Sequence, residues 1–491
     1  MPTCSVCSSD LACPSRCFLV RTDVTGPVRD RPSITRRRWC IVRKTDESGA
    51  QRRIPVKNAM FKFSAALTLA AAATSAAYAG GFMLTEQSVA GLGRAYAGSG
   101  IVGDDLSAVW YNPAGMVLLP GTQFQMGSVM AYLDLDVETN KGDTDNGAKH
   151  GVPIPNMFFT HQMNEDMWFG FGITVPFGMA TEYKRDWELA DHGMNAEVKV
   201  FDFNPNVAWK VNDKLSIGAG MSLQYVTAHF ESGVPVGGAT GYGRLSADGW
   251  AWGGNLGVMW QPTETLRFGL AYRSQVNHHA DGTFKAGMKT GPDGIPKLGI
   301  PANTSGKGYN LGTYDGQATM SAPHVVTLTG TWEATQALRL SGLVRWTNWA
   351  SFDSLPITSS AFGRLGQMAG NPTSSNTHKE EYHWKDSWLF TLGADYTIND
   401  AVTVRGGVGY EISPVDDDKY RSATIPDTDR LWLSLGATWH VNNKLQGDFG
   451  LAYLKGIGDK GLYNKTTGEQ LGEFNKLDAI LVGAQFVYRF D

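Results

Sequence analysis

The chain has 491 residues and a formal net charge of −4; 58 residues are glycine, 11% are aromatic and only 18% are charged. Soluble domains average about 7% glycine and about 25% charged residues. The composition therefore argues against the roughly two to four soluble domains that the length would suggest, and the acidic balance gives no reason to expect nucleic acid.

The first 59 residues have a composition of their own. All five cysteines lie there, and basic residues outnumber acidic residues by 12 to 5. Cys4, Cys7, Cys13 and Cys17 resemble a zinc framework, but their irregular spacing argues against a metal site. We expect neither a metal nor a cofactor in this protein.

A secretory signal peptide follows this stretch. Residues 60–79 contain a short cationic start at Met60, an apolar alanine-rich run over 63–73 and Ala-Tyr-Ala at 77–79. This order of features is typical of a cleaved export signal. We therefore expect Met60 to be the initiator, residues 1–59 to be a non-structural extension, and cleavage to occur before residue 80.

In the remaining chain, residues 80–491, apolar residues alternate with small or polar residues and do not form long apolar runs. This part of the chain contains no run of about 18 apolar residues, so helical membrane spans are not expected. Instead, every second residue is apolar over Trp250–Trp260, Trp388–Tyr396 and Ile480–Phe490, with aromatic residues towards the ends. This period of two predicts β-strands with one apolar face.

Fourteen such segments are predicted. They begin near Thr122, Pro153, Asp166, Asn195, Lys214, Ala247, Thr265, Ala318, Ala337, Tyr382, Ala401, Asp427, Lys444 and Lys476. Tight turns such as Asn212-Asp213 alternate with longer Gly-rich connections, the longest at about 279–317 and 353–381. An even strand number, an outward apolar stripe and alternating loop lengths are typical of outer-membrane barrels.

We therefore predict an all-β fold, a 14-stranded antiparallel transmembrane β-barrel over residues 122–491. The alternative is a soluble sandwich or propeller, which requires neither aromatic strand ends nor the loop rhythm. Residues 80–121 fit no strand pattern. A barrel of this size leaves an interior that its own side chains do not fill, so we expect residues 80–121 to form a hatch, or plug, in the lumen.

The hatch region carries a family resemblance. Gly81–Ser88, Gly91–Gly98, Asp104-Asp105 and Tyr111–Gly115 resemble the N-terminal hatch of the FadL family, outer-membrane transporters of long-chain fatty acids and other hydrophobic compounds. The likeness continues over most of the chain, at Phe177–Tyr183, Asn204–Ala208, Ser413–Val415 and Ile425–Arg430. It implies a location in the Gram-negative outer membrane, passive transport and no catalytic residue.

Within the hatch, the resemblance points to Phe82 and to Asn112-Pro113-Ala114. Proline fixes φ and a buried asparagine must find partners, so the tripeptide is expected to form a rigid turn anchored to the barrel wall. An ordinary Asn-Pro turn with a packing role alone is the alternative.

The third predicted strand contains Pro176, Phe177 and Gly178. Proline cannot donate to a β-ladder and is out of place in a continuous wall. The resemblance implies a kink in this strand that opens a lateral gap, and we expect the gap at these residues. Alternatively, Pro176 stands at the upper end of the strand, where the ladder finishes anyway.

Strand alternation also identifies lumenal charges. It directs Arg273, Arg345, Lys385, Glu411 and Arg430 inward, and the last three stand at the long-loop end of adjacent strands. Two cations and one anion could bind the carboxylate of a fatty acid. Alternatively, Glu411 and Arg430 pair with each other and with the hatch, which leaves Lys385 as the freer cation. No basic residue matches on the fifth strand, where His229 is the nearest polar residue.

We therefore expect passive uptake of a long-chain fatty acid or another aromatic or aliphatic compound. The ligand is captured by the outer loops, enters a lumenal pocket, and leaves sideways through the third strand after a hatch rearrangement. A general diffusion porin would lack the hatch, and an outer-membrane lipid-modifying enzyme would need a nucleophile with a paired base.

The expected partners follow from this location. They are the ligand, outer-membrane lipid and lipopolysaccharide, and the barrel assembly machinery, for which Phe486, Tyr488 and Phe490 supply an aromatic C-terminal signal. The protein is expected to be a monomer.

Overall fold

The computed structural model describes residues 80–147, 151–184, 187–236, 239–289, 309–368 and 375–490. The expected extension, residues 1–59, and the expected signal peptide, residues 60–79, lie outside the described residues. Among the described residues, no helix is long and apolar enough to cross a membrane.

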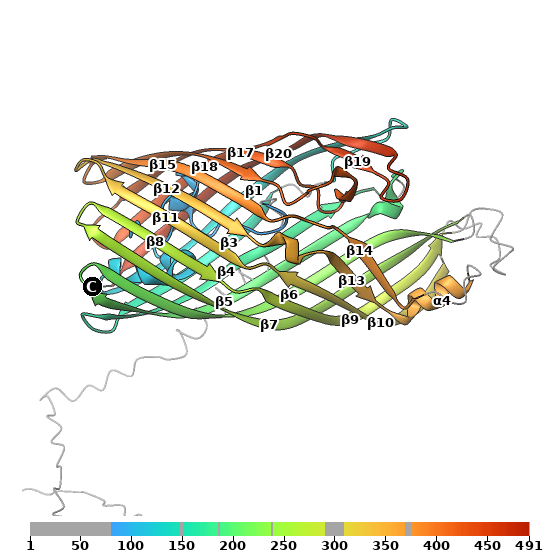
Figure 1. Ribbon diagram of the computed structural model, residues 1–491, viewed down its shortest axis with the longest axis horizontal. Coiled ribbons are helices and arrows are strands. Elements are labelled where there is room, and N and C mark those ends of the chain that lie inside the picture. Colours follow the sequence, from blue (N-terminus) through green and yellow to red (C-terminus); the bar gives the residue numbers. More distant parts are fainter. Residues whose placement is uncertain are drawn as a thin grey trace, which may run out of the picture. The chain divides into compact units, whose positions relative to one another are not determined.

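Twenty strands of the described chain form one sheet, and fourteen of them close into an antiparallel barrel (Figure 1). The barrel strands are β1 (Thr122–Thr139), β3 (Val152–Gln162), β4 (Met167–Glu182), β5 (Asn195–Asn212), β6 (Leu215–Val236), β7 (Ala239–Thr263), β8 (Leu266–Arg273), β11 (Val325–Glu333), β12 (Leu338–Thr347), β15 (Ser387–Asn399), β16 (Val402–Ile412), β17 (Asp429–His440), β18 (Leu445–Ile457) and β20 (Gln470–Arg489). The ring closes where β1 pairs with β20.

The two faces of the wall have opposite character. Large apolar side chains point outward and are exposed, such as Trp252 at 76%, Leu392 at 68% and Leu435 at 65%. Polar side chains such as Asn255 and Gln485 point inward and are buried. A soluble sandwich or propeller would bury its apolar face, so this arrangement fits a wall surrounded by lipid and confirms the predicted barrel.

The two longest connections were expected to be loops, but they contain further strands and a helix. They contain β9 (Val276–Lys289), β10 (Tyr309–Ala322), β13 (Ser354–Thr358) and β14 (Thr377–Glu381), which extend the sheet beyond the barrel, with α4 (Ser360–Met368) beside them (Figure 1). Accordingly, Ala318, the predicted start of the eighth barrel strand, belongs to β10, and the eighth barrel strand is β11. These strands form because their inner face is apolar, as at Phe284 and Met320, and because Phe284 packs against Phe362 of α4.

The smaller elements lie in the connections and in the hatch. They are α2 (Val89–Leu92), α3 (Ala108–Tyr111), the 3-10 helices η1 (Pro113–Leu118), η2 (Ala190–His192), η4 (Trp349–Ser351) and η5 (Asp418–Tyr420), and the short strands β2 (Thr144–Asp145) and β19 (Gly461–Tyr463).

The hatch fills the lumen, as its burial shows: Val89, Tyr96 and Ile101 are each 0% exposed. It also contacts the last strand, because the Val89 amide donates to Gln485 Oε1 of β20 at 2.7 Å.

Candidate functional site

The middle of the hatch is fixed to the wall by buried ion pairs. Arg94 Nη1 lies 2.6 Å from Asp104 Oδ2 in the hatch and 3.2 Å from Asp395 Oδ1 of β15. Arg405 of β16 joins them, with Nε 3.2 Å from Asp395 Oδ1. Although burial opposes ionisation, Arg94 and Arg405 hold the pKa of Asp104 well below its usual range. We call these four residues the latch.

Asn112 supplies a second fixed point. Its Nδ2 donates to the Val258 carbonyl of β7 at 3.0 Å, and its Oδ1 accepts from the Ala114 amide at 3.1 Å. Pro113 occupies the first position of η1, where its missing N–H costs nothing. The wall allows this close approach through Gly257, since a Cβ there would lie 2.1 Å from Asn112 Oδ1. The tripeptide is thus an anchored turn.

The wall itself is irregular at β4. In the described ladder, β3 pairs with β4 over Trp168–Ile173, and beyond this point β4 continues to Glu182 against β5. The β4–β5 register shifts between Thr174 and Phe177. Pro176 therefore lies inside the strand, so the alternative that placed it at the strand's end does not hold. Beyond Ile173, the edge of β4 that faces β3 is therefore not paired with β3, and we call this stretch the upper part of β4.

A short hatch segment, residues 82–87, occupies this open edge, and we call it the edge segment. Its Leu84 amide donates to the Pro176 carbonyl at 2.8 Å, and the Gly178 amide donates to the Phe82 carbonyl at 2.9 Å. The edge segment thus pairs with β4 like an additional strand.

Aromatic packing completes the attachment of the edge segment. Phe82 is 0% exposed, and its ring centroid lies 4.7 Å from that of Trp349, 5.3 Å from that of Phe352 and 5.9 Å from that of Phe177. Trp384 lies slightly further away, at 6.2 Å. Phe82 is therefore held by apolar contacts, in contrast to the charged latch.

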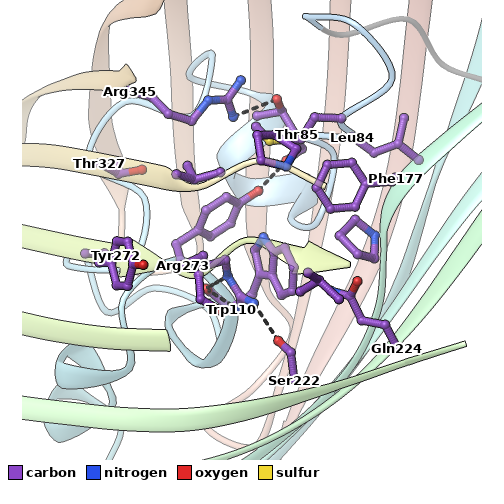
Figure 2. A pocket seen from close by; sticks show the side chains of 18 of the residues that line it. Leu84, Thr85, Trp110, Phe177, Ser222, Gln224, Tyr272, Arg273, Thr327 and Arg345 are labelled. Atoms are coloured by element: carbon purple, nitrogen blue, oxygen red, sulfur yellow. Dashed lines mark hydrogen bonds between the residues drawn. The ribbon is translucent and has the colours of Figure 1, made fainter. Parts of the chain in front are cut away.

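A cavity lies beside the edge segment (Figure 2). Its volume is about 60 Å³, and its lining includes Leu84, Thr85, Phe177, Arg273 and Arg345. A cavity needs about 10–15 Å³ by this measure to hold one water. The cavity therefore has room for several waters or for a small head group.

Arg273 of β8 is a fully engaged arginine. Its guanidinium carbon lies 3.2 Å from the centroid of the Trp110 ring, and Nη2 donates to the Trp110 carbonyl at 2.9 Å. The same group donates to Asn204 Oδ1 at 2.9 Å and to Ser222 Oγ at 3.1 Å. Arg273 thus fixes Trp110 of the hatch.

Arg345 of β12 connects the edge segment to buried charges. Its Nη1 donates to Thr85 Oγ1 at 2.9 Å, and its Nη2 lies 3.3 Å from Glu411 Oε1. Glu411 in turn lies 3.6 Å from Arg430 Nη1 and accepts from Trp432 Nε1 at 3.3 Å. One carboxylate is thus shared between two arginines.

The structure brings Glu411 and Arg430 together, but it does not bring Lys385 to them. Lys385 Nζ lies 3.4 Å from Asp416 Oδ1, and the side chain is 43% exposed. The reason is that β15 begins only at Ser387, so the inward-outward alternation does not extend to Lys385.

Two further groups lie outside the site. His229 is exposed, with Nδ1 3.1 Å from Ser246 Oγ, and therefore does not face the lumen as a head-group ligand would. Within the part of the chain that the structure describes, no group of three or more His, Cys, Asp or Glu side chains could hold a metal ion.

Sequence reasoning missed Glu86 of the edge segment. It is 0% exposed, and in the described structure neither carboxyl oxygen has a hydrogen-bond partner from another residue. The pKa of Glu86 is raised from 4.5 to about 7, chiefly by burial and also by neighbouring Glu411, against the opposing effects of its own backbone amide, Arg345 and Arg430. No motif or spacing marks this residue, because its burial depends on the fold around it.

Comparison with known proteins agrees with this architecture. Residues 70–490 match the family described as outer membrane protein transport protein (OMPP1/FadL/TodX). The chain is 30% identical over 463 residues to a long-chain fatty acid transport protein of Escherichia coli, covering 88% of this chain and 99% of the relative. It is 28% identical to outer membrane protein P1 of Haemophilus influenzae, over 81% of this chain and 91% of the relative.

Solved structures show the same fold. A Pseudomonas aeruginosa FadL homologue aligns with a TM-score of 0.71 at 22% identity, covering 84% of this chain and all of that one. The Pseudomonas putida toluene transporter TodX aligns with a TM-score of 0.62 at 16% identity, covering 79% and 94%. The chain therefore belongs to the FadL/TodX family of outer-membrane transport proteins.

Proposed function

We propose that this member of the family is a passive transporter that takes up long-chain fatty acids or other hydrophobic compounds and releases them sideways into the outer membrane. One relative is a long-chain fatty acid transport protein, and a toluene transporter shares the fold. The observation that carries the proposal is the open upper edge of β4, which the edge segment occupies beside the lumenal cavity.

The two attachments of the hatch favour this route. The latch joins the hatch to the wall through a network of charges in which Arg94 and Asp104 of the hatch face Asp395 and Arg405 of the wall, and undocking would take all of these ion pairs apart. The edge segment is held instead by backbone hydrogen bonds and by Phe82. Its release opens the wall at Pro176 while the latch keeps the rest of the hatch in place.

A buried apolar cluster reaches from the extension to this opening. It includes Leu245 and Phe284, with Phe362 packed against it, and Phe82 belongs to the same cluster. Burial of each methylene group stabilises by about 0.8 kcal/mol, which favours transfer of a long chain from water into such an apolar region.

A reversible cross-link tests the lateral route. Met83 and Phe177 form an antiparallel bridge, and directly opposed strand residues have Cα atoms about 4.5–5.5 Å apart, within disulfide range. Since all five cysteines precede residue 60, a chain expressed from Met60 carries no competing thiol. In Met83→Cys/Phe177→Cys, oxidation should reduce oleate uptake by cells to background, and a reductant should restore it.

The two single-cysteine variants are the controls, treated identically, and should transport equally with and without oxidant. If the fully cross-linked protein takes up oleate as fast as the same protein after treatment with reductant, lateral release at β4 is refuted. Liposome swelling with sugars, if it occurred, would instead favour a general diffusion porin.

A further inference from the structure

A buried cluster of charged side chains lies at the start of the edge segment. Its members are Glu86 of the edge segment and Arg345, Glu411, Asp427 and Arg430 of the barrel, and they are between 0% and 7% exposed. Glu411 is shared between the two arginines, and Arg430 also pairs with Asp427. We call these five residues the charge cluster.

The charge cluster lacks one positive charge. Among its described members three are carboxylates and two are arginines, so its formal charge is −1 when every member is ionised. Neither carboxyl oxygen of Glu86 has a hydrogen-bond partner from another residue in the described structure. Lys385 does not supply the charge, because its Nζ pairs with Asp416 at the rim. A buried charge without a partner is costly, so a further cation here would stabilise the docked hatch.

Gly80, the first residue that the structure describes, lies against the charge cluster. Gly80 is buried, and the amide of the next residue, Gly81, donates to Asp427 Oδ2 at 3.0 Å. A Cβ on Gly80 would lie 2.8 Å from Glu411 Oε1 and 3.6 Å from Ser387 Oγ. The Cα of Gly80 is therefore one bond length from a point at hydrogen-bonding distance from a buried carboxylate.

The expected cleavage before residue 80 changes the chemistry of the Gly80 nitrogen. In the uncleaved chain this nitrogen belongs to a neutral amide. Hydrolysis of the Ala79–Gly80 peptide bond consumes one water, leaves a carboxylate on Ala79 and frees an amino group on Gly80. The amino group takes up a proton at neutral pH, because the pKa of an α-amino group is ordinarily about 7.7–8.0.

The new ammonium can reach Glu411 without movement of the backbone beyond Gly80. Once no residue precedes Gly80, rotation about its Cα–C bond brings the nitrogen to the tetrahedral position that a Cβ would occupy. That position is 2.8 Å from Glu411 Oε1. Hydrogen bonds between an ammonium and a carboxylate are about 2.7–2.9 Å long, so the distance fits an ion pair.

We infer that the α-ammonium of Gly80, created when the leader is removed, pairs with Glu411 and completes the charge cluster. Gly80 and Gly81 directly precede the edge segment, so this ion pair attaches the start of the edge segment to β16. Full docking of the hatch thus depends on removal of the leader, because the precursor offers only a neutral amide at this position. The inference rests on the expected cleavage and is independent of which compound is transported.

Titration of the N-terminal amine tests the ion pair. The mass of the purified protein must first show that it begins at Gly80, and any other N-terminus would overturn the inference. The rate at which acetic anhydride acetylates Gly80 is then followed against pH by peptide mass spectrometry. Burial alone lowers the pKa of an amine, whereas a carboxylate partner raises it. The wild-type amine should therefore titrate at least one pH unit above the ordinary range of about 7.7–8.0.

Two variants separate the ion pair from a general effect of the wall. Glu411→Gln should return the titration of Gly80 to the ordinary range or below it. Glu231→Gln is the matched control, because it removes another carboxylate that pairs with an arginine, Arg244 of β7, and it should leave the titration unchanged. A wild-type amine that titrates in or below the ordinary range, or a raised value that persists in Glu411→Gln, would overturn the inference.

A second readout addresses the docking of the edge segment. One glycine inserted between Ala79 and Gly80 keeps the Ala-Tyr-Ala site and moves the ammonium one residue away from Glu411. With Met83→Cys as the single thiol, the maleimide labelling rate should rise at least tenfold on insertion. In Glu411→Gln the same insertion should change the rate less than twofold. An equal rise in both backgrounds would assign the effect to the added length, and this result or the absence of any rise would overturn the inference.

Discussion

Replacing Phe82 by alanine should release the edge segment without unfolding the barrel. The ring is fully buried among Phe177, Trp349 and Phe352, with centroid distances from 4.7 to 5.9 Å. Truncation of a buried phenylalanine costs about 3–5 kcal/mol. Because this contact holds the edge segment against the wall, the lost free energy destabilises the docked state of the edge segment. At 1.4 kcal/mol per factor of ten, the equilibrium constant for docking should drop by roughly 10²- to 10³-fold.

Thiol labelling measures this equilibrium. Met83 is 8% exposed in the docked state, and Met83→Cys in a chain expressed from Met60 provides a single thiol. When docking is faster than labelling, the labelling rate follows the undocked fraction. The rate should rise at least 10²-fold in Phe82→Ala, by the same conversion, while the melting temperature of the barrel stays unchanged.

The control is Phe390→Ala, the same truncation on the outward face, where the ring is 42% exposed. It should leave the labelling rate of Met83→Cys unchanged. A folded Phe82→Ala protein that labels within twofold of the wild-type rate would refute the reasoning that aromatic packing holds the edge segment.

Three further predictions concern the rest of the hatch. Arg94→Gln removes the ion pairs of the hatch with Asp395 and with Asp104, so planar-bilayer recordings should show frequent ion-conducting openings; silent traces would contradict the role of the latch. Glu86 has a pKa of about 7 when docked and about 4.5 when exposed, so docking is strongest below pH 4.5 and weakens as the pH rises to 7. Labelling of Met83→Cys, corrected for thiol ionisation, should therefore increase over that window in the wild type and remain flat in Glu86→Gln. Asn112→Ala removes the hydrogen bond to β7 and should cost about 1–3 kcal/mol of hatch stability, seen as faster hydrogen exchange over η1 with unchanged exchange in the strands.

Strand alternation predicted the wall well, because a transmembrane barrel imposes a strict period of two. Alternation directs Arg345 and Arg430 inward, and both are buried. The rule failed at Lys385, which precedes the first residue of β15. It also assigned most of β9 and β10 to a loop over about 279–317, because strands beyond the membrane do not need a continuous apolar outer face.

The contacts between hatch and wall could not be predicted from local pattern. Arg345 and Thr85 are 260 residues apart, and Asn112 lies 146 residues from its Val258 partner. Periodicity reports which face a side chain takes but not which distant segment covers it. The resemblance located the hatch motif and Pro176, whereas the exposed β4 edge became visible only from the register of β3 against β4.

The contact between the hatch and the last strand constrains how this protein assembles. The barrel closes by pairing β1 with β20, the first and last strands of the wall, and Val89 of the hatch bonds to Gln485 on β20. Pairings between such distant segments form slowly, because the intervening chain must be ordered first. The seam and the Val89 contact both need β20, so the hatch cannot complete its docking before the last strand is in place. Docking of the first described segment of the chain therefore belongs to the last steps of folding.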